Sequence, residues 1–235
     1  MAGTVTHLAI ADKIYSILGD SVIKNLPLFF GGNIAPDAIH AKKDYQRADK
    51  KRSHLCEGIR SYGYGYPEIS ELFKDRVNEF IQNYYLPAGD EKDLYLGYVT
   101  HLLADECNLL MIYRHLEEDL KNNEANAVGS DFRKNLADSV NNGEYRDIFK
   151  NISNIYDISI HDYQFKQNIM DILEAVWDYG VKDYVGANEI NISKRWVIDT
   201  FFKGESPQGN NKCDKEIEFI DLTAKNIIER LSSIL

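Results

Sequence analysis

Apolar residues recur at helical spacing along most of the chain. The first stripe follows Thr6, a residue type that often caps a helix, and runs to Gly19, where a glycine is expected to end the helix. Its members share one face at helical spacing: His7, Ile10, Ile14, Ile17 and Leu18. Because His7 shares this stripe, it is predicted to point inward from the first helical turn.

Two further helices are predicted in the first half of the chain. Pro67 is typical of a first helical position, and the apolar stripe after it runs to Tyr84. A longer pattern extends from roughly Lys92 to Leu120. Between the first helix and these two, glycines and a proline predict that residues 28–40 form a compact, partly apolar loop, and the charged segment 41–53 is predicted to face solvent.

The second half of the chain also has a helical pattern. A polar segment at 121–130 is the best candidate for a boundary. Beyond it, amphipathic stripes occur over 169–177 and 217–231. The sequence contains no recurring strand alternation, no repeat of 20–50 residues, and neither a P-loop nor a dinucleotide-binding glycine pattern. The fold class predicted from these patterns is all-α.

The composition excludes several classes of protein. Hydrophobic residues make up 44% of the chain and charged residues 27%, which excludes collagen-like, disordered and disulfide-scaffold proteins. The 27 basic and 37 acidic residues give a net charge of −10. This charge argues against general nucleic-acid binding and against docking on anionic lipid through bulk charge.

Three features predict a cytoplasmic protein. The 3 cysteines are widely spaced, which fits reduced thiols better than a disulfide framework. The N-terminal segment lacks the basic and apolar regions of a secretory signal, and no stretch approaches about 18 consecutive apolar residues. No transmembrane segment is therefore expected, and the sequence leaves the oligomeric state open.

The sharpest chemical feature is the pair His101 and Asp105, which lie on one helix face at i, i+4 spacing. Imidazole and carboxylate are common zinc ligands, although an isolated pair is more typical of a buried histidine supported by an acid. Three more candidates stand upstream: His7, Asp37 and His54. Burying such groups without partners would be costly, and a shared cation removes that cost.

Four segments that contain these residues occur in one order within about residues 1–110: THLAIADKI, FFGGNIAPDAIH, KKRSHLCEG and LGYVTHLLADE. Together they resemble the zinc-dependent phospholipase C family, of which the fungal single-strand-specific zinc nucleases are more distant members. The resemblance implies a multi-helix bundle with a metal site between its helices. It also implies up to three zinc ions, which activate water for phosphodiester hydrolysis.

The resemblance implies roles for five residues. His7 matches the histidine of the family's N-terminal helix, Asp37 the aspartate of its N-x-x-P-D turn, and His54 the histidine of its S-H motif. His101 and Asp105 match the central H-x₃-D, whose carboxylate bridges two zinc ions in the family. All five are predicted metal ligands, and Asp37 is also the predicted catalytic residue, as a general base.

The number of ions expected is one or two, with manganese or iron as alternatives to zinc. Met111 stands where the secreted family members have a further histidine, ten residues after the first histidine of H-x₃-D. The next pair, His115 and Asp119, would lie about 21 Å from His101 along an unbroken helix, too far to share the same cluster.

Other polar residues near the motifs have two interpretations each. Glu106 is expected to face solvent, with orientation of a ligand histidine as the alternative. His40 either faces substrate or lies on the surface, and the basic residues 50–52 either attract phosphate or are simply solvated. Three tyrosines in the segment 61–68 either form a rim over the site or are half-buried loop residues.

The sequence thus predicts a single all-α domain over residues 1–235, with residues 1–120 as the metal-site half and 131–235 as the C-terminal helical half. The predicted function is metal-dependent hydrolysis of a small phosphoester or phospholipid, in which activated water attacks a phosphodiester. One alternative is a non-catalytic helical binding module with a structural or degenerate metal site. A second is an HD-type phosphohydrolase, suggested by the dipeptide His161–Asp162.

Overall fold

Helices account for the regular structure of the protein, as the sequence predicts. A computed structural model describes residues 3–59, 67–123, 147, 150–152, 158, 160, 163–175, 178–204 and 213–235. Within these ranges there is no β-strand, and an isolated antiparallel bridge joins Val181 and Val185. The all-α prediction is confirmed.

The main helices in chain order are α1 (Thr4–Leu18), α2 (Leu26–Ala38), α3 (Arg47–Ser53), α4 (Pro67–Phe80), α5 (Lys92–Asn123), α8 (Ile169–Glu174), α9 (Ala187–Val197) and α10 (Cys213–Leu231). Shorter elements extend or connect them: the 3-10 helices η1 (Ile39–Ala41) and η4 (Gly89–Glu91), and the π-helices η3 (Ile81–Tyr85) and η5 (Ile198–Phe202). None of the described helices is both long enough and apolar enough to span a membrane.

Helix α1 matches its prediction closely. It begins at Thr4, two residues before the expected cap, and ends at Gly19, whose φ is positive at 63°. A glycine tolerates this conformation without steric strain, so it ends the helix as the sequence indicates. His7 points inward and is 1% exposed.

The prediction of a loop over residues 28–40 is wrong, because most of this segment forms α2. Its glycines allow close packing instead of breaking the helix. A β-carbon on Gly32 would lie 1.9 Å from the carbonyl oxygen of Leu94, and one on Gly97 would lie 1.9 Å from that of Phe29. The backbones of α2 and α5 therefore approach each other where both helices lack a side chain, and this packing outweighs the low helix propensity of glycine.

The charged segment 41–53 is solvent-facing only in part. Its C-terminal half forms α3, whose Ser53 is buried and whose Lys50 is half-buried. The predicted helix from Pro67 is confirmed as α4 continued by η3, and the long helix is confirmed as α5, which runs unbroken to Asn123. The first three residues of the predicted linker at 121–130 belong to α5, and the remainder lies outside the described residues.

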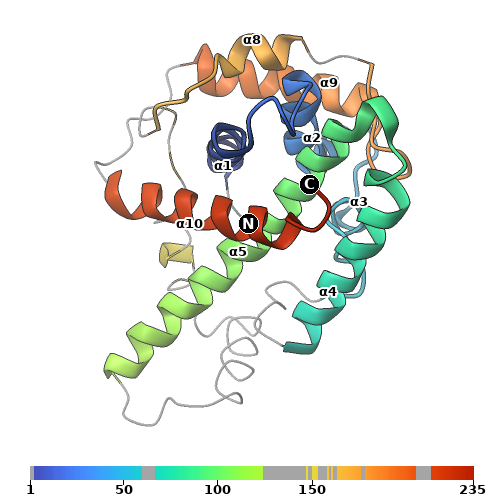
Figure 1. The fold of residues 1–235 in the computed structure, drawn as a ribbon. Coiled ribbons are helices and arrows are strands. Elements are labelled where there is room, and N and C mark those ends of the chain that lie inside the picture. The colour runs from blue at the N-terminus through green and yellow to red at the C-terminus, as the bar shows by residue number, and fades with distance from the viewer. Residues whose placement is uncertain are drawn as a thin grey trace.

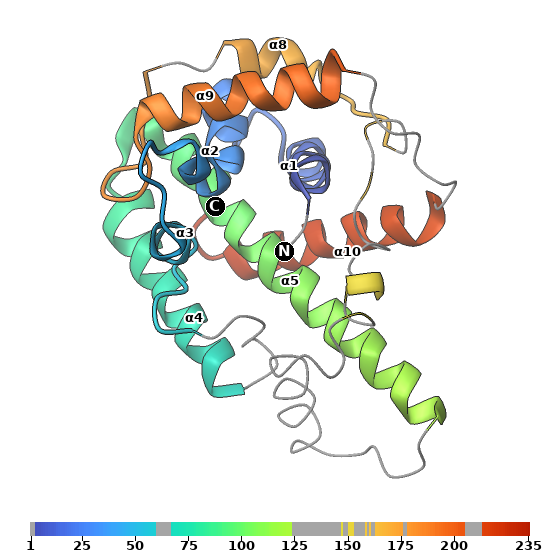
Figure 2. The same cartoon turned by 180° about the vertical axis from the view of Figure 1, so that it is seen from behind.

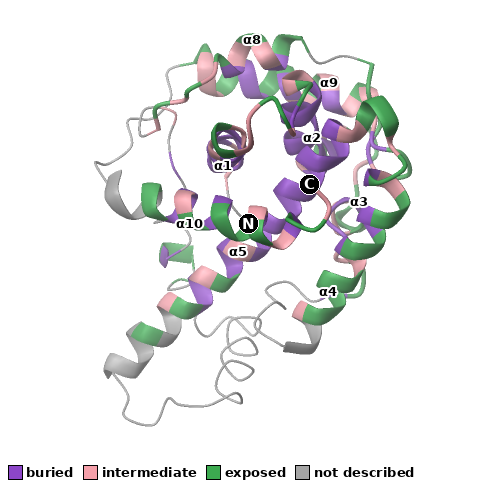
Figure 3. Cartoon of the chain, viewed as in Figure 1, coloured by how far each residue is buried: buried purple, intermediate pink, exposed green. Residues whose placement is uncertain are grey.

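Helix α5 runs obliquely through the molecule, and its C-terminal end extends away from the other labelled helices (Figures 1 and 2). Helix α2 packs along it, α1 packs between α2 and α10, and α9 covers α2 and η1 from outside. Buried residues gather on α1, α2 and the adjoining part of α5 (Figure 3). The polar candidates predicted from the sequence lie among these most buried helices.

Candidate metal centre

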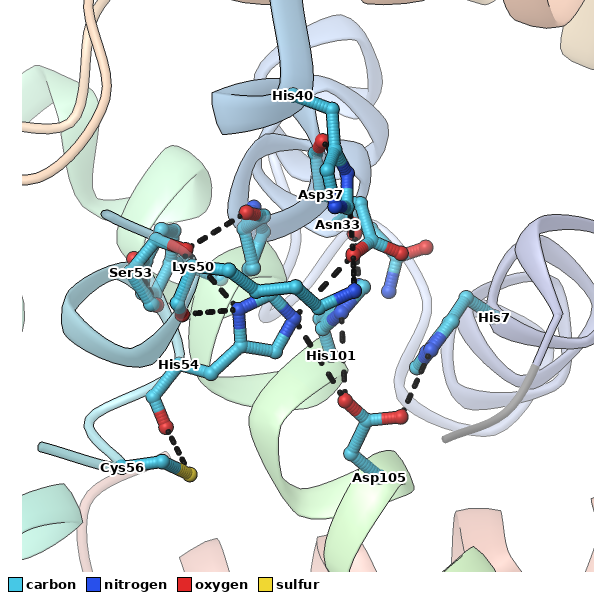
Figure 4. Close-up of polar contacts among 12 residues, drawn as sticks. His7, Asn33, Asp37, His40, Lys50, Ser53, His54, Cys56, His101 and Asp105 are labelled. Carbon is cyan, nitrogen blue, oxygen red and sulfur yellow. Dashed lines mark hydrogen bonds and ion pairs between the residues drawn. The ribbon is translucent and has the colours of Figure 1, made fainter. Parts of the chain in front are cut away.

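The structure brings all five predicted residues together. His7 comes from α1, Asp37 from α2, and His101 and Asp105 from α5, while His54 directly follows α3 (Figure 4). Four of them are almost fully buried, each at most 4% exposed: His7, His54, His101 and Asp105. Residues almost 100 positions apart in sequence therefore meet at one point between four helices.

The Asp105 carboxylate lies at the centre of this cluster. Its Oδ1 is 3.3 Å from His7 Nε2, and its Oδ2 is 3.7 Å from His54 Nε2 and 3.8 Å from His101 Nε2. Asp37 lies on the other side of His54, with Oδ1 3.3 Å from the same Nε2. Three imidazoles thus direct Nε2 at two carboxylates.

Two of the histidines are held by their other ring nitrogen. Nδ1 of His101 lies 2.7 Å from the carbonyl oxygen of Asn33, and Nδ1 of His54 lies 3.0 Å from that of Lys50. A carbonyl oxygen can only accept a hydrogen bond, so Nδ1 must carry the proton in both rings. In a neutral imidazole the lone pair is then on Nε2, which points into the cluster and is available to a metal.

The support around His54 extends to a second layer of polar groups. Ser53 Oγ lies 2.9 Å from His54 Nδ1 and donates to the carbonyl oxygen of Pro36 at 2.9 Å. The hydroxyl of the buried Tyr98 donates in turn to the Ser53 carbonyl oxygen. These bonds tie the end of α3 to both α2 and α5, and so fix the position from which His54 reaches the cluster.

His7 is placed by stacking. Its ring lies parallel to that of His101, with the centroids 3.7 Å apart and the planes 7° from each other. Within the described part of the chain, neither ring nitrogen of His7 makes a hydrogen bond, and neither do the Nε2 atoms of His54 and His101. Buried nitrogens that make no hydrogen bond are costly, so the three Nε2 atoms are arranged for a ligand that accepts lone pairs.

Burial and mutual contacts set the charge state of the cluster. Burial and the neighbouring His7 lower the pKa of His101 to about 3, so this ring is neutral near pH 7. Burial alone would raise the pKa of Asp37, but contact with His54 and the charge of Lys50 hold it well below its usual range. The pKa of Asp105 is likewise lowered, against its burial, by His7 and His101. Neutral imidazole and ionised carboxylate are the forms that bind metal ions.

The donor set fits a zinc ion. Ligand atoms within 4.8 Å of one another form two overlapping groups, one of His7, His101 and Asp105 and the other of Asp37, His54 and His101. Both contain the nitrogen and oxygen donors that zinc prefers, and each leaves room in a four-coordinate shell for a further ligand. Because Asp105 directs one oxygen toward each group, it is placed to bridge them.

A cleft of about 550 Å³ opens beside this cluster. His7, Asp37 and His101 line it, which connects the predicted ligands to solvent. Lys50 also lines it, with Nζ 2.9 Å from Asp37 Oδ1, and so does Asn33. The Asn33 side chain is fully buried, and its amide nitrogen and oxygen make no hydrogen bond to any described residue.

The remaining predicted candidates fall in different places. His40 lines the cleft and points Nδ1 at the carbonyl oxygen of Asp37, 2.9 Å away, so it belongs to the rim and not to the cluster. His115 lies 14 residues along the unbroken α5 from His101 and is therefore about 21 Å away, as expected. His161, Asp162 and the tyrosines of 61–66 lie outside the described residues.

The expectation that Glu106 faces solvent is wrong. Glu106 is 5% exposed and accepts from Arg230 of α10 and, at 3.4 Å, from Ser70 of α4. Neither of these partners is a histidine, so the alternative role of orienting a ligand is not supported. One position along a helix turns a side chain by about 100°, which directs Asp105 into the cluster and Glu106 toward α10.

The sequence reasoning missed Asn33, Ser53 and the cleft-lining residues of α9. Asn33 lies four residues before Asp37, so a helical interpretation of residues 28–40 would have placed both on one face. On α9, the exposed apolar residues Ile192 and Trp196 have the same i, i+4 spacing. This spacing was the sequence feature that could have indicated an apolar face on this helix.

Comparison with known proteins agrees with this geometry. The family model described as zinc dependent phospholipase C matches residues 6–178, which include all five clustered residues. The family is zinc-dependent, and the His/Asp cluster has the donors to bind such an ion. No curated protein and no solved structure gives a significant match to the chain.

Proposed function

Because the chain belongs to the zinc-dependent phospholipase C family, we propose that it hydrolyses phosphodiester bonds of a phospholipid or small phosphoester with zinc held by His7, Asp37, His54, His101 and Asp105. One observation carries the proposal: three anchored or stacked histidines direct Nε2 atoms that make no hydrogen bond at the carboxylates of Asp37 and Asp105, and His7, Asp37 and His101 line an open cleft. A merely structural metal site would not need the cleft.

The two groups of ligands suit two adjacent metal positions. His7, His101 and Asp105 would hold one ion and Asp37, His54 and His101 a position beside it, with Asp105 between them. Bound zinc supplies Lewis acidity, which lowers the pKa of water and stabilises charge on phosphoryl oxygens. Asp37 keeps both roles predicted for it, ligand and proton acceptor, and its lowered pKa favours the ligand role.

Two further side chains of the cleft suit the phosphoryl group. Lys50 presents an ammonium beside Asp37, and its position on the cleft wall allows it to bind a phosphoryl oxygen. The amide of Asn33, which lacks a described partner, would donate to a second oxygen. Both groups would position the ester and stabilise the negative charge that develops on it.

The packing of the C-terminal helices supports a single-domain organisation for the chain. Helix α9 packs on α2, which carries Asp37, and α10 packs on α1, which carries His7. The helices of the second half therefore contact the helices that present the proposed ligands, which fits the 1–120 and 131–235 halves as parts of one unit.

The test combines metal content with hydrolysis. Protein purified without a metal-affinity tag is analysed for zinc and assayed on bis(4-nitrophenyl) phosphate and on short-chain phosphatidylcholine, before and after treatment with EDTA. We expect one to two zinc ions per chain and activity that EDTA abolishes and zinc restores. His101→Ala should lose metal and at least about 100-fold in activity, since it removes a residue common to both groups.

A control variant on the same helix distinguishes loss of a metal ligand from a general effect of substituting a histidine on α5. His115→Ala lies about 21 Å from His101 along α5 and should keep both zinc and activity. Zinc binding without hydrolysis of either substrate would favour the non-catalytic module. Loss of metal in His161→Ala, with retention in His101→Ala, would favour the HD-type alternative.

A further inference from the structure

One wall of the cleft beside the metal centre is apolar, unlike the His/Asp cluster. Ile192, Trp196 and Val197 of α9 line it, together with Ile34 of α2. Ile192 is 44% exposed and Trp196 is 54% exposed, although both are large apolar residues. Single exposed apolar residues are common on protein surfaces, but here they adjoin one another on a cavity that also contains the proposed zinc ligands.

The wall has a defined shape. Trp196 packs edge-on against Phe201 of η5, with ring centroids 5.4 Å apart and planes 87° apart. Val197 is 1% exposed and fixes the inner side of the same helix. Helix α9 itself packs against α2 and η1, the elements that carry Asp37 and His40. The apolar wall is therefore built on a helix that packs directly against the elements next to the cluster.

We infer that the face of α9 formed by Ile192, Trp196 and Val197 is a subsite for the hydrocarbon part of the phosphoester substrate. The inference deepens the proposed function and rests on it in one respect, because it places the phosphoryl group at the His/Asp end of the cleft. Residues 6–178 match the family model, whereas α9 begins at Ala187. This determinant of specificity thus lies in a part of the chain outside the matched family segment.

The chemistry of the wall selects a hydrocarbon over a nucleobase. A base presents several polar edge atoms that require hydrogen-bond partners when buried. Of the four residues of α9 that line the cleft, Ser193 is the one with a polar side chain, beside Ile192, Trp196 and Val197. An alkyl or acyl chain needs no such partner and gains free energy with each methylene that leaves water.

The experiment measures binding and so does not depend on turnover. Zinc-loaded protein is titrated by calorimetry with methyl, butyl, hexyl and octyl phosphate below their micellar concentrations. In the wild type, affinity should rise about two- to fourfold for each added methylene. In Ile192→Ser/Trp196→Ala the factor by which each added methylene raises the affinity should fall to near one. The affinity of this variant for methyl phosphate should equal that of the wild type.

Matched controls separate the subsite from general surface hydrophobicity. Ile217 of α10 is 42% exposed and does not line the cleft, so Ile217→Ser should keep the full chain-length dependence. The chain has 2 tryptophans. A fluorescence change on octyl phosphate binding that disappears in Trp196→Phe would therefore come from Trp196.

Three results would decide between the claims. Equal affinity of the wild type for methyl and octyl phosphate would overturn the subsite, and so would tighter binding of adenosine 5′-monophosphate that Trp196→Ala abolishes. Chain-length-dependent binding that the double variant loses, in a protein that hydrolyses no phosphodiester with zinc, would support the subsite and overturn the proposed activity.

Discussion

Asp105 and Glu106 are adjacent in sequence, and both carboxylates are buried, but their surroundings differ. Glu106 is 5% exposed and is paired with the guanidinium of Arg230. Asp105 is 4% exposed and faces three imidazoles, of which His101 is held neutral by its lowered pKa. The first carboxylate is paired with an arginine, and the second faces a group of histidines.

This difference separates a structural polar site from a functional one. A buried carboxylate paired with an arginine has its charge balanced within the fold, and here the pair joins α5 to α10. A buried carboxylate faced by imidazoles whose Nε2 atoms make no hydrogen bond forms a set of donors that can bind a cation. Burial of an acid alone therefore does not identify a metal centre, whereas the metal-binding side chains that face it do.

The largest effect is expected when Asp105 loses its charge. Asp105→Asn keeps the size of the side chain but removes the anion that faces both ligand groups. We expect metal affinity to fall at least about 100-fold and activity with it. Zinc content by elemental analysis and hydrolysis of bis(4-nitrophenyl) phosphate measure this, and full zinc occupancy in the variant would contradict it.

At the Glu106 site the expected effect is on stability instead of metal binding. Arg230→Met leaves Glu106 buried without its cation and should lower the free energy of unfolding by about 3 kcal/mol, the lower end for a broken buried pair because Arg230 is 27% exposed. Urea unfolding measures the loss. Glu106→Leu/Arg230→Met should regain most of it, and the zinc content of both variants should equal that of the wild type.

Disturbing the close contact of α2 with α5 should weaken zinc binding at the Asp105 site and leave the Glu106–Arg230 ion pair in place. In Gly97→Ala the new β-carbon would lie 1.9 Å from the Phe29 carbonyl oxygen, so α2 must move away from α5. We expect a loss of about 2 kcal/mol in stability and weaker zinc binding, because Asp37 moves with α2. Calorimetric zinc titration tests this, and unchanged affinity would show that the cluster tolerates the shift.

The last expected effect is a pH dependence of the zinc-free protein, which at any one pH step is small. The pKa of His101 is lowered from 6.5 to about 3 by folding, so between these values the unfolded chain binds a proton that the folded chain does not. Stability should therefore fall as pH decreases from 6.5 toward 3, with a contribution that approaches about 1.4 kcal/mol per pH unit.

A non-titrating variant isolates this contribution. His101→Asn retains a donor for the Asn33 carbonyl oxygen and should show a shallower slope in urea unfolding between pH 6.5 and 4 in the presence of EDTA. Parallel slopes for the variant and the wild type would assign the acid sensitivity to other groups.

The sequence by itself determined the helical class and most of the helices. Apolar spacing located α1, α4 and α5, because each of these helices buries one continuous face whose period is visible in the sequence. The motifs around His7, Asp37, His54, His101 and Asp105 also identified the candidate ligands, and the structure brings these five residues together. The four-residue spacing of His101 and Asp105 also predicted that these two residues share one face of a helix.

Only the tertiary structure decided what local propensity could not show. Gly31, Gly32 and Pro36 indicate a loop when read locally, yet their segment is helical because close packing on α5 compensates for it. The cation that neutralises Glu106 lies 124 residues away on α10, and the apolar wall beside the cluster comes from α9. Contacts between distant segments carry no periodic signal, so they become visible only when the helices are packed.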